Sequence, residues 1–258
     1  MSERIGVAGV TGQVGRLLAE ELEKSSATLT GGTLGRNTQK TPPAGVRIYP
    51  SVEELAADSD AVIDFTHAST IFSFGEQVVR GKVAWIIGTS GLTAAHWDVL
   101  REAAKTVPVL YASSFAATSV LMPDLVATLA RLLPAEEYDT EIIEAHHKYK
   151  VDAPSGTATT LGRLICETRG LNFDEMAVLG RKGETGPRKV GSIGFGAIRA
   201  GEIVGETKIY FMSDDETIIL DRRVFDRRVY AVGAIQAARW AIGKPAGLYS
   251  MKDVLGQS

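Results

Sequence analysis

Four side chains that can carry positive charge fall within five consecutive positions of the chain: His146, His147, Lys148 and Lys150. A helical pattern of apolar residues begins soon afterwards. Pro154 suits the start of that helix, and either Ser155 or Thr157 can cap it. The free N–H groups and positive dipole end of a helix start attract a carboxylate or phosphate. We therefore predict an anion site beside proton-transferring groups, with a solvated basic turn as the alternative.

The N-terminus carries a second pattern with chemical meaning, Gly9-x-x-Gly12-x-x-Gly15, between an apolar run and a helical pattern. A strand, a glycine turn and a helix in this order are typical of dinucleotide binding, because glycines let the backbone approach a pyrophosphate. The second predicted strand is followed by Arg36 and lacks the carboxylate that usually meets the ribose of NAD. Arg36 suits a 2′-phosphate, so we expect NADPH to bind at least as well as NADH. The alternative is an ordinary surface cation.

Short apolar runs alternate with helical patterns through the first 113 residues, which predicts an α/β fold with a doubly wound, Rossmann-like parallel sheet. The strands are expected at 4–8, 28–34, 61–65, 83–87 and 107–111. The helices are expected after Gly12, after the capping pair Ser51 and Glu54, near 70–80, and at 93–105. Polar tips follow three of the strands, at 66–67, 88–91 and 113–114. Ligands gather at the carboxyl ends of parallel strands, so we expect these tips around the nicotinamide.

The pattern changes from about residue 139. A strand over 138–145, the cationic turn and the helix are followed by three extended runs at 191–199, 202–212 and 216–224. No helix separates these runs, so they fit a mixed or antiparallel sheet in an α+β domain. The charged loop 180–189 is interpreted as a connector, with a mobile cover as the alternative. A final helix over 232–242 precedes a tail that packs on the first domain.

The expected organisation is therefore a dinucleotide-binding domain, 1–116 with 228–258, and a substrate-binding and oligomerisation domain, 117–227. The 258 residues are 45% hydrophobic and suffice for two such cores. The net charge of −3 argues against nucleic-acid binding, and no apolar run is long enough to span a membrane. The single cysteine, Cys166, excludes a disulfide framework and fits helix packing. No metal-ligand spacing occurs, and we expect a cytoplasmic protein.

Taken together, the motifs match a known family along the whole chain. They are the Gly9/Gly12/Gly15 turn, Asp64-Phe-Thr66, Gly88-Thr-Ser-Gly91, Glu144-Ala-His-His-x-x-Lys150-x-Asp-Ala-Pro-Ser-Gly-Thr157-Ala, Ser192-Ile-Gly-Phe195, Arg199-Ala-Gly-x-Ile-Val-Gly-Glu206 and Gly247-Leu-Tyr249. The chain resembles the dihydrodipicolinate reductase family of bacterial lysine and diaminopimelate synthesis. The resemblance implies a homotetramer that uses NADPH or NADH to reduce a small cyclic dicarboxylate to tetrahydrodipicolinate.

The resemblance also implies roles for individual residues. His146 and Lys150 are the catalytic pair that handles protons. Three residues bind the substrate carboxylates: His147, Gly156 and Thr157. Fourteen residues line the cofactor: Gly9, Val10, Thr11, Gly12, Gln13, Val14, Arg36, Gly88, Thr89, Ser90, Ala112, Ser113, Ser114 and Phe115. No metal site is implied.

The chain departs from the usual family pattern at four places: Gln13, Thr118-Ser119, Thr207 and Arg222-Arg223. None of these departures replaces either residue of the catalytic pair, His146 and Lys150. Two alternative functions stay open: a nicotinamide-dependent reductase of another small cyclic imine or dicarboxylate, and a non-catalytic NADPH-binding sensor. A semialdehyde dehydrogenase would need a nucleophilic cysteine at a strand-to-helix junction, and Cys166 is badly placed for that.

Overall fold

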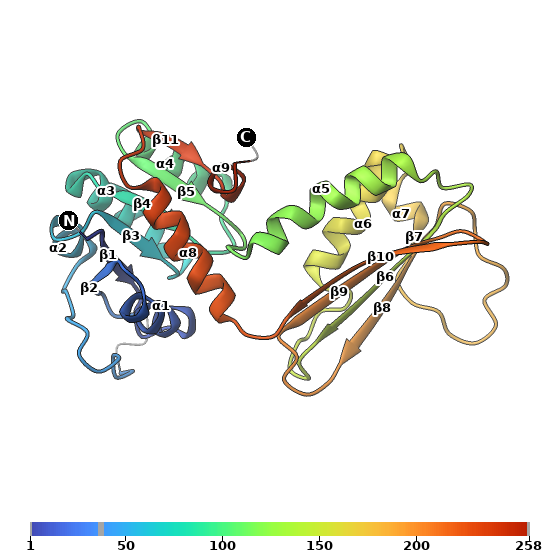
Figure 1. Cartoon of the computed structure of the whole chain (residues 1–258), viewed down its shortest axis with the longest axis horizontal. Coiled ribbons are helices and arrows are strands. Elements are labelled where there is room, and N and C mark those ends of the chain that lie inside the picture. Colours follow the sequence, from blue (N-terminus) through green and yellow to red (C-terminus); the bar gives the residue numbers. More distant parts are fainter. Residues whose placement is uncertain (1, 36–38, 257–258) are drawn as a thin grey trace. The chain divides into compact units, whose positions relative to one another are not determined.

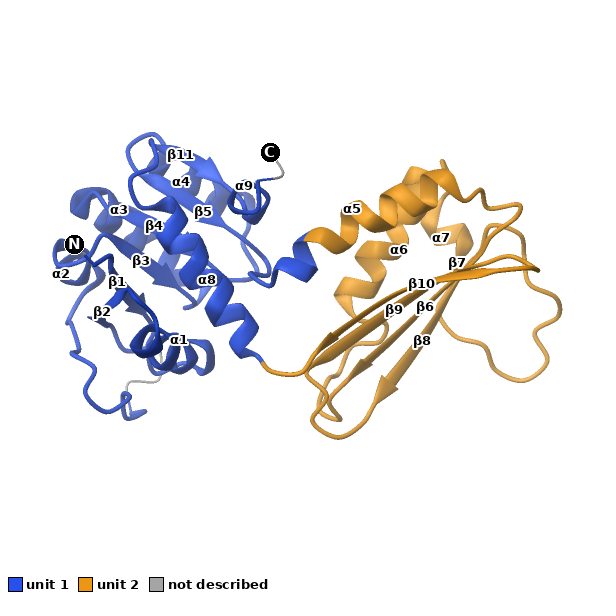
Figure 2. Cartoon of the chain, viewed as in Figure 1, with its two compact units in different colours: residues 1–120, 227–258 blue, residues 121–226 orange. Residues whose placement is uncertain are grey.

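The computed structural model describes residues 2–35 and 39–256, which separate into two compact units. Unit 1 comprises residues 1–120 and 227–258, and unit 2 comprises residues 121–226 (Figure 2). Each unit has a sheet and a hydrophobic core of its own.

Unit 1 is built on a six-stranded sheet in the order β11-β5-β4-β3-β1-β2 (Figure 1). Every pair of neighbouring strands is parallel. The strands are β1 (Arg4–Ala8), β2 (Thr28–Gly32), β3 (Ala61–Asp64), β4 (Ala84–Ile87), β5 (Pro108–Tyr111) and β11 (Gly247–Tyr249). This sheet confirms the predicted Rossmann-like architecture, and the C-terminal tail contributes β11 at its edge.

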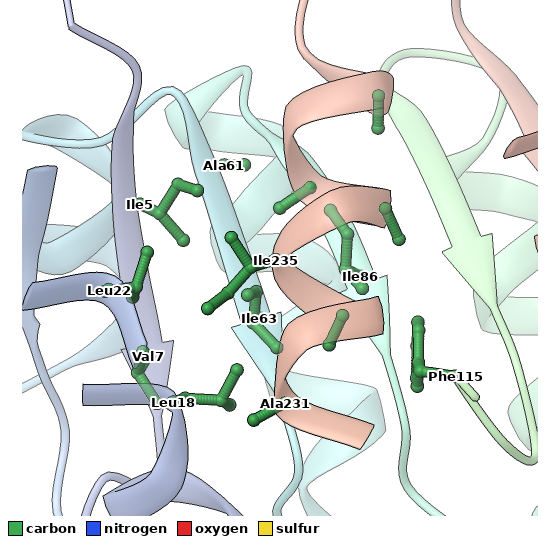
Figure 3. Packing of buried hydrophobic residues seen from close by; sticks show 14 of the residues in the cluster. Ile5, Val7, Leu18, Leu22, Ala61, Ile63, Ile86, Phe115, Ala231 and Ile235 are labelled. Atoms are coloured by element: carbon green, nitrogen blue, oxygen red, sulfur yellow. The ribbon is translucent and has the colours of Figure 1, made fainter. Parts of the chain in front are cut away.

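Helices cover both faces of this sheet. They are α1 (Gln13–Lys24), α2 (Val52–Ala57), the 3-10 turn η1 (Ala68–Thr70), α3 (Ile71–Gly81), α4 (Ala94–Ala103), α8 (Arg228–Ala241) and α9 (Met251–Val254). Figure 3 shows Leu18 and Leu22 of α1 and Ile235 of α8 packing with Ile5 and Ile63 of the sheet. Residues of α2, α3 and α4 pack with the alternate strand residues, including Val62 and Trp85. Because both faces are covered, the carboxyl ends of the strands remain for ligands.

Unit 2 contains a five-stranded sheet in the order β10-β9-β6-β8-β7. The strands are β6 (Asp139–His146), β7 (Ala177–Val178), β8 (Ile193–Arg199), β9 (Gly205–Met212) and β10 (Thr217–Val224). β9 is antiparallel to both β6 and β10, whereas β8 is parallel to both β6 and β7. The sheet is therefore mixed, which confirms one of the two predicted forms.

Two long helices pack on one face of this sheet: α5 (Ala117–Leu132) and α6 (Gly156–Thr168). The short α7 (Phe173–Met176) follows α6. Val126 of α5 and Ile165 of α6 join Ile142 and Phe211 of the strands in the core. Cys166 of α6 is buried in the same core, and burial raises the pKa of its thiol, which fits the predicted packing role.

The structure differs from the sequence prediction mainly at helices. The sequence pattern predicts no element over 117–132, where the structure has α5. Pro123 lies inside this helix, and its lack of an amide donor weakens the local helical signal. The final helix begins at Arg228, one turn before the predicted start at Val232. The second strand ends at Gly32 and not at Leu34.

Within the described ranges, 2–35 and 39–256, no helix is both long and apolar enough to cross a membrane. The same ranges bring together no group of three or more histidine, cysteine, aspartate or glutamate residues fit to hold a metal ion.

Candidate active site

The glycine turn of unit 1 joins β1 to α1 in a backbone arrangement that other residues would obstruct. Gly9 has φ +77°, in the left-handed region that favours glycine. A Cβ on Gly15 would overlap the carbonyl oxygen of Gly9 and lie 2.8 Å from Cα of Val10. Gly12 caps α1 without a side-chain hydrogen bond, so the first-turn N–H groups of the helix are free for an anion. This geometry fits the pyrophosphate of a dinucleotide.

The sheet order brings the predicted cofactor segments to one edge of unit 1. Because β1, β3, β4 and β5 are consecutive neighbours, the segments that follow them lie at the same carboxyl edge. A Cβ on Gly9 would lie 2.9 Å from the methyl group of Thr66, and one on Gly88 would overlap the ring of Phe65. The Phe65 ring in turn lies 5.4 Å from the ring of Phe115. The loops 88–90 and 112–115 thus lie against Phe65, whose neighbour Thr66 lies against the glycine turn.

Two of the predicted cofactor residues, Thr11 and Gln13, differ in their exposure to solvent. Thr11 is buried, and its hydroxyl accepts a hydrogen bond of 3.0 Å from the N–H of Gly35, which ties the glycine turn to the segment after β2. Gln13 is exposed as the first residue of α1. The prediction for Arg36 concerns a residue outside the described ranges.

The cationic turn of unit 2 connects the end of β6 to the start of α6. Ser155 is the N-cap residue, and its hydroxyl accepts a hydrogen bond of 3.3 Å from the N–H of Ala158, which decides between the two predicted caps. Gly156 and Thr157 form the exposed start of the helix. A Cβ on Gly156 would meet nothing within 4 Å, so the space beside the first residue of the helix is open.

A buried carboxylate, Glu144, holds this turn together. Its Oε2 accepts a hydrogen bond of 2.6 Å from Nδ1 of His146, and the Arg199 guanidinium donates to both of its oxygens at 2.6 and 2.8 Å. Its Oε1 also accepts a hydrogen bond of 3.1 Å from the N–H of Ser155. Burial alone would raise the pKa of Glu144, but hydrogen bonds from Arg199 and His146 outweigh it and keep this pKa below its usual value. Glu144 is therefore an acceptor-only carboxylate.

Lys150 and His147 lie in the turn itself. The Lys150 ammonium donates a hydrogen bond of 2.6 Å to Oδ1 of Asp152, and this bond is the main cause that lowers the pKa of Asp152. The Lys150 N–H donates to the carbonyl of His147 at 3.1 Å, which closes the turn. The Nδ1 atom of His147 is buried and has no hydrogen-bond partner among the described residues. The structure thus brings His146, Lys150 and the start of α6 into one region.

Sequence reasoning assigned no role to Glu144 or Arg199, although both belong to the quoted motifs. One signal was present, since Glu144 and His146 are two positions apart on a strand and so share a face. Two of the family departures lie beside this group. Thr207 on β9 pairs across the sheet with Glu144, and Arg222 on β10 pairs with Thr207, so these departures form one row next to the candidate site.

A profile described as the N-terminus of dihydrodipicolinate reductase matches residues 3–115, and one described as its C-terminus matches residues 118–255. The chain belongs to the dihydrodipicolinate reductase family. The family resemblance found in the sequence is thereby confirmed.

Curated members of the dihydrodipicolinate reductase family align along the full chain. The 4-hydroxy-tetrahydrodipicolinate reductase of Granulibacter bethesdensis is 48% identical over 255 residues, which covers 99% of this chain and 97% of that protein. The protein of the same name from Gluconacetobacter diazotrophicus is 44% identical over 253 residues, covering 98% and 97%.

Solved structures agree on the fold. A dipicolinate-bound dihydrodipicolinate reductase from Paenisporosarcina sp. TG-14 has a TM-score of 0.78 at 22% identity, covering 97% of this chain and 98% of that one. A DAP dehydrogenase from C. glutamicum, in complex with DAP, has a TM-score of 0.56 at 14% identity, covering 96% and 92%. At these identities the two structures support the fold alone.

Proposed function

We propose that this protein is a 4-hydroxy-tetrahydrodipicolinate reductase, an NADPH- or NADH-dependent oxidoreductase of lysine and diaminopimelate synthesis. Its substrate is 4-hydroxy-tetrahydrodipicolinate and its product is tetrahydrodipicolinate. The observation that carries the proposal is the gathering of His146, Lys150 and the open start of α6 in a member of this family. We assign cofactor binding to unit 1 and substrate binding to unit 2.

The start of α6 suits one carboxylate of the substrate. The amides of Gly156 and Thr157 lie in the first turn, where N–H groups have no partner within the helix and the dipole is positive. The open space at Gly156 gives a carboxylate access to them. We assign His147 to the same dicarboxylate, because its buried Nδ1 has no partner among the described residues. These contacts would fix the ring relative to the nicotinamide. Orientation of this kind can supply several kcal/mol of a reaction barrier, and about 7 kcal/mol in efficient cases.

His146 and Lys150 are the proposed catalytic residues. When bound, reduced nicotinamide supplies a hydride to the ring. Loss of the 4-hydroxyl group as water turns the substrate into a conjugated imine. Addition of hydride to this imine leaves negative charge that must be stabilised and protonated to give tetrahydrodipicolinate. The Lys150 ammonium can donate a proton once a substrate carboxylate or ring nitrogen replaces Asp152 as its partner. His146 holds a second proton in the same region.

The cofactor residues of unit 1 need supply only binding and orientation. The glycine turn and the uncapped start of α1 fit a pyrophosphate, and we assign Gly9 to Val14 to it. We assign the loops 88–90 and 112–115 to the nicotinamide half, because they follow neighbouring strands at the carboxyl edge. Arg36 remains our proposed contact for a 2′-phosphate.

A direct assay tests the proposal. The condensation product of pyruvate and aspartate semialdehyde is mixed with NADPH and the purified protein, and the loss of NADPH absorbance is followed. We expect oxidation that depends on both the protein and this product. NADPH binding without oxidation would support the sensor alternative, and oxidation only with other cyclic imines would support the alternative reductase. Either result would overturn the proposal.

We further propose a homotetramer that works in the cytoplasm. Ile143, Ile198 and Ile219 lie on the sheet face of unit 2 opposite α5 and α6, and they are 37%, 50% and 49% exposed. Further copies of the chain that pack on this face would remove these side chains from water. Analytical ultracentrifugation tests the assembly, and a monomer at assay concentrations would contradict it.

A further inference from the structure

Glu144 uses both carboxylate oxygens to join three separate segments of unit 2. The partners are the ring of His146 on β6, the guanidinium of Arg199 on β8 and the N–H of Ser155 at the start of α6. The Glu144 side chain is only 1% exposed, so a charge here is stable only with this full set of donors. Arg199 supplies the permanent positive charge, and it also donates to the carbonyl of Asp152 at 2.6 Å.

The contact with Glu144 determines which nitrogen of His146 carries the proton. An ionised carboxylate can only accept, so the 2.6 Å contact requires a proton on Nδ1 of His146. In the neutral ring, Nε2 is then the free nitrogen. This atom lies on the side of Gly205, where an added Cβ would come within 3.3 Å of it. Gly205 therefore leaves space at the nitrogen that faces away from Glu144.

We propose that Glu144, held by Arg199, is the positioning residue of the site. It fixes the ring of His146 with Nδ1 protonated, and through Ser155 it holds the start of α6 in register with that ring. Its effect on turnover rests on the proposed function, because it acts through His146. The tautomer and the alignment of the helix follow from the geometry alone.

A second glutamate on the same strand provides a matched control. Glu141 is also paired with arginines, since Arg181 donates to its oxygens at 2.8 and 2.9 Å and Arg188 forms another ion pair with it. Unlike Glu144, Glu141 is not bonded to His146 or to the start of α6 in any described contact. A general loss of ion pairing with arginine would therefore affect both glutamates, whereas positioning concerns Glu144 alone.

The test compares Glu144→Gln with Glu141→Gln in the full-length protein. An amide keeps the shape of the carboxylate but presents a donor as well as an acceptor. In Glu144→Gln we expect kcat to fall about a hundredfold, the lower end of the contribution of an acid–base group, with the Kd for NADPH unchanged. Glu141→Gln should keep kcat within about threefold of the wild type, since Glu141 makes no described contact with His146 or the start of α6.

Nitrogen NMR of the His146 ring at alkaline pH gives a readout that a merely structural role would not change. The wild type and Glu141→Gln should show the proton on Nδ1, and Glu144→Gln should shift it toward Nε2. A wild-type ring protonated on Nε2 would overturn the inference, even if Glu144→Gln fails to fold. Unchanged kcat and tautomer in a folded Glu144→Gln would do the same. Absence of any wild-type turnover would instead contradict the proposed function, while the tautomer result would still decide the positioning role.

Discussion

The two units each bury a carboxylate near the carboxyl end of a strand, in opposite electrostatic settings. Asp64 at the end of β3 is bonded to neutral donors: the N–H and hydroxyl of Thr66 at 2.9 and 2.6 Å, and the indole of Trp85 at 3.4 Å. Burial raises the pKa of Asp64, and these bonds only partly oppose it. Glu144 is equally buried, but Arg199 and His146 keep its pKa low.

This contrast extends to the candidate sites. The unit 1 site is formed by backbone, with glycines that allow close approach and a helix start without a side-chain cap. The unit 2 site is formed by charged side chains around Glu144. The first site should therefore be sensitive to added atoms, and the second to changes of charge or proton position.

The largest effect is expected from removing the proposed proton-handling groups. Lys150→Ala and His146→Ala should each lower kcat by about a hundredfold or more, because each removes an acid–base group. The Kd for NADPH should hardly change, since both residues belong to unit 2. Steady-state kinetics and fluorescence titration with NADPH measure the two quantities. Unchanged turnover in either variant would remove its role assignment.

A pair of glycine substitutions tests the sensitivity to added atoms. Gly15→Ala places a methyl group against the carbonyl of Gly9, so we expect a loss of about 1–3 kcal/mol in stability and at least about a tenfold weaker NADPH affinity. The methyl group added by Gly156→Ala would have no neighbour within 4 Å, so the stability of this variant should differ from that of the wild type by less than about 1 kcal/mol. Urea unfolding and calorimetric titration with NADPH compare them. Equal losses of stability in the two variants would contradict the expected difference between the two sites.

The smallest effect concerns the pH dependence of stability. The raised pKa of Asp64 means that the folded protein binds the proton of this carboxyl group more tightly than the unfolded chain does. Its contribution to the free energy of unfolding is therefore lost as pH rises from about 3.8 through the folded pKa. The lowered pKa of Glu144 has the opposite sign, and its contribution is present above about 4.5 and lost as pH falls through the folded pKa. Relative to the wild type, Asp64→Asn should therefore gain stability with rising pH, and Glu144→Gln should lose it. Urea unfolding at several acidic pH values checks the two slopes, and slopes of the same sign would contradict the comparison.

The sequence predicts the parts of the fold that depend on local patterns. The glycine turn from Gly9 to Gly15 and the alternation of strands and helices in unit 1 follow from spacing and turn chemistry. The same local signals limit the cap of α6 to Ser155 or Thr157, and the structure selects Ser155. The helix over 117–132 escapes prediction because Pro123 interrupts its local signal while the core of unit 2 stabilises it. The role of Arg199 escapes for a different reason. It lies 55 residues from Glu144, and only pairing of β6 with β8 brings them together.

The most direct test of the account locates a planar dicarboxylate on the full-length protein. Dipicolinate, the ligand in the Paenisporosarcina structure, can be titrated while backbone amide signals are followed by NMR. We predict saturable shifts at Gly156 and Thr157 that weaken in Lys150→Ala, with Gly9 to Val14 shifting only when NADPH is added. Shifts confined to the glycine turn, or none at the start of α6, would contradict the claim that this helix start binds the substrate.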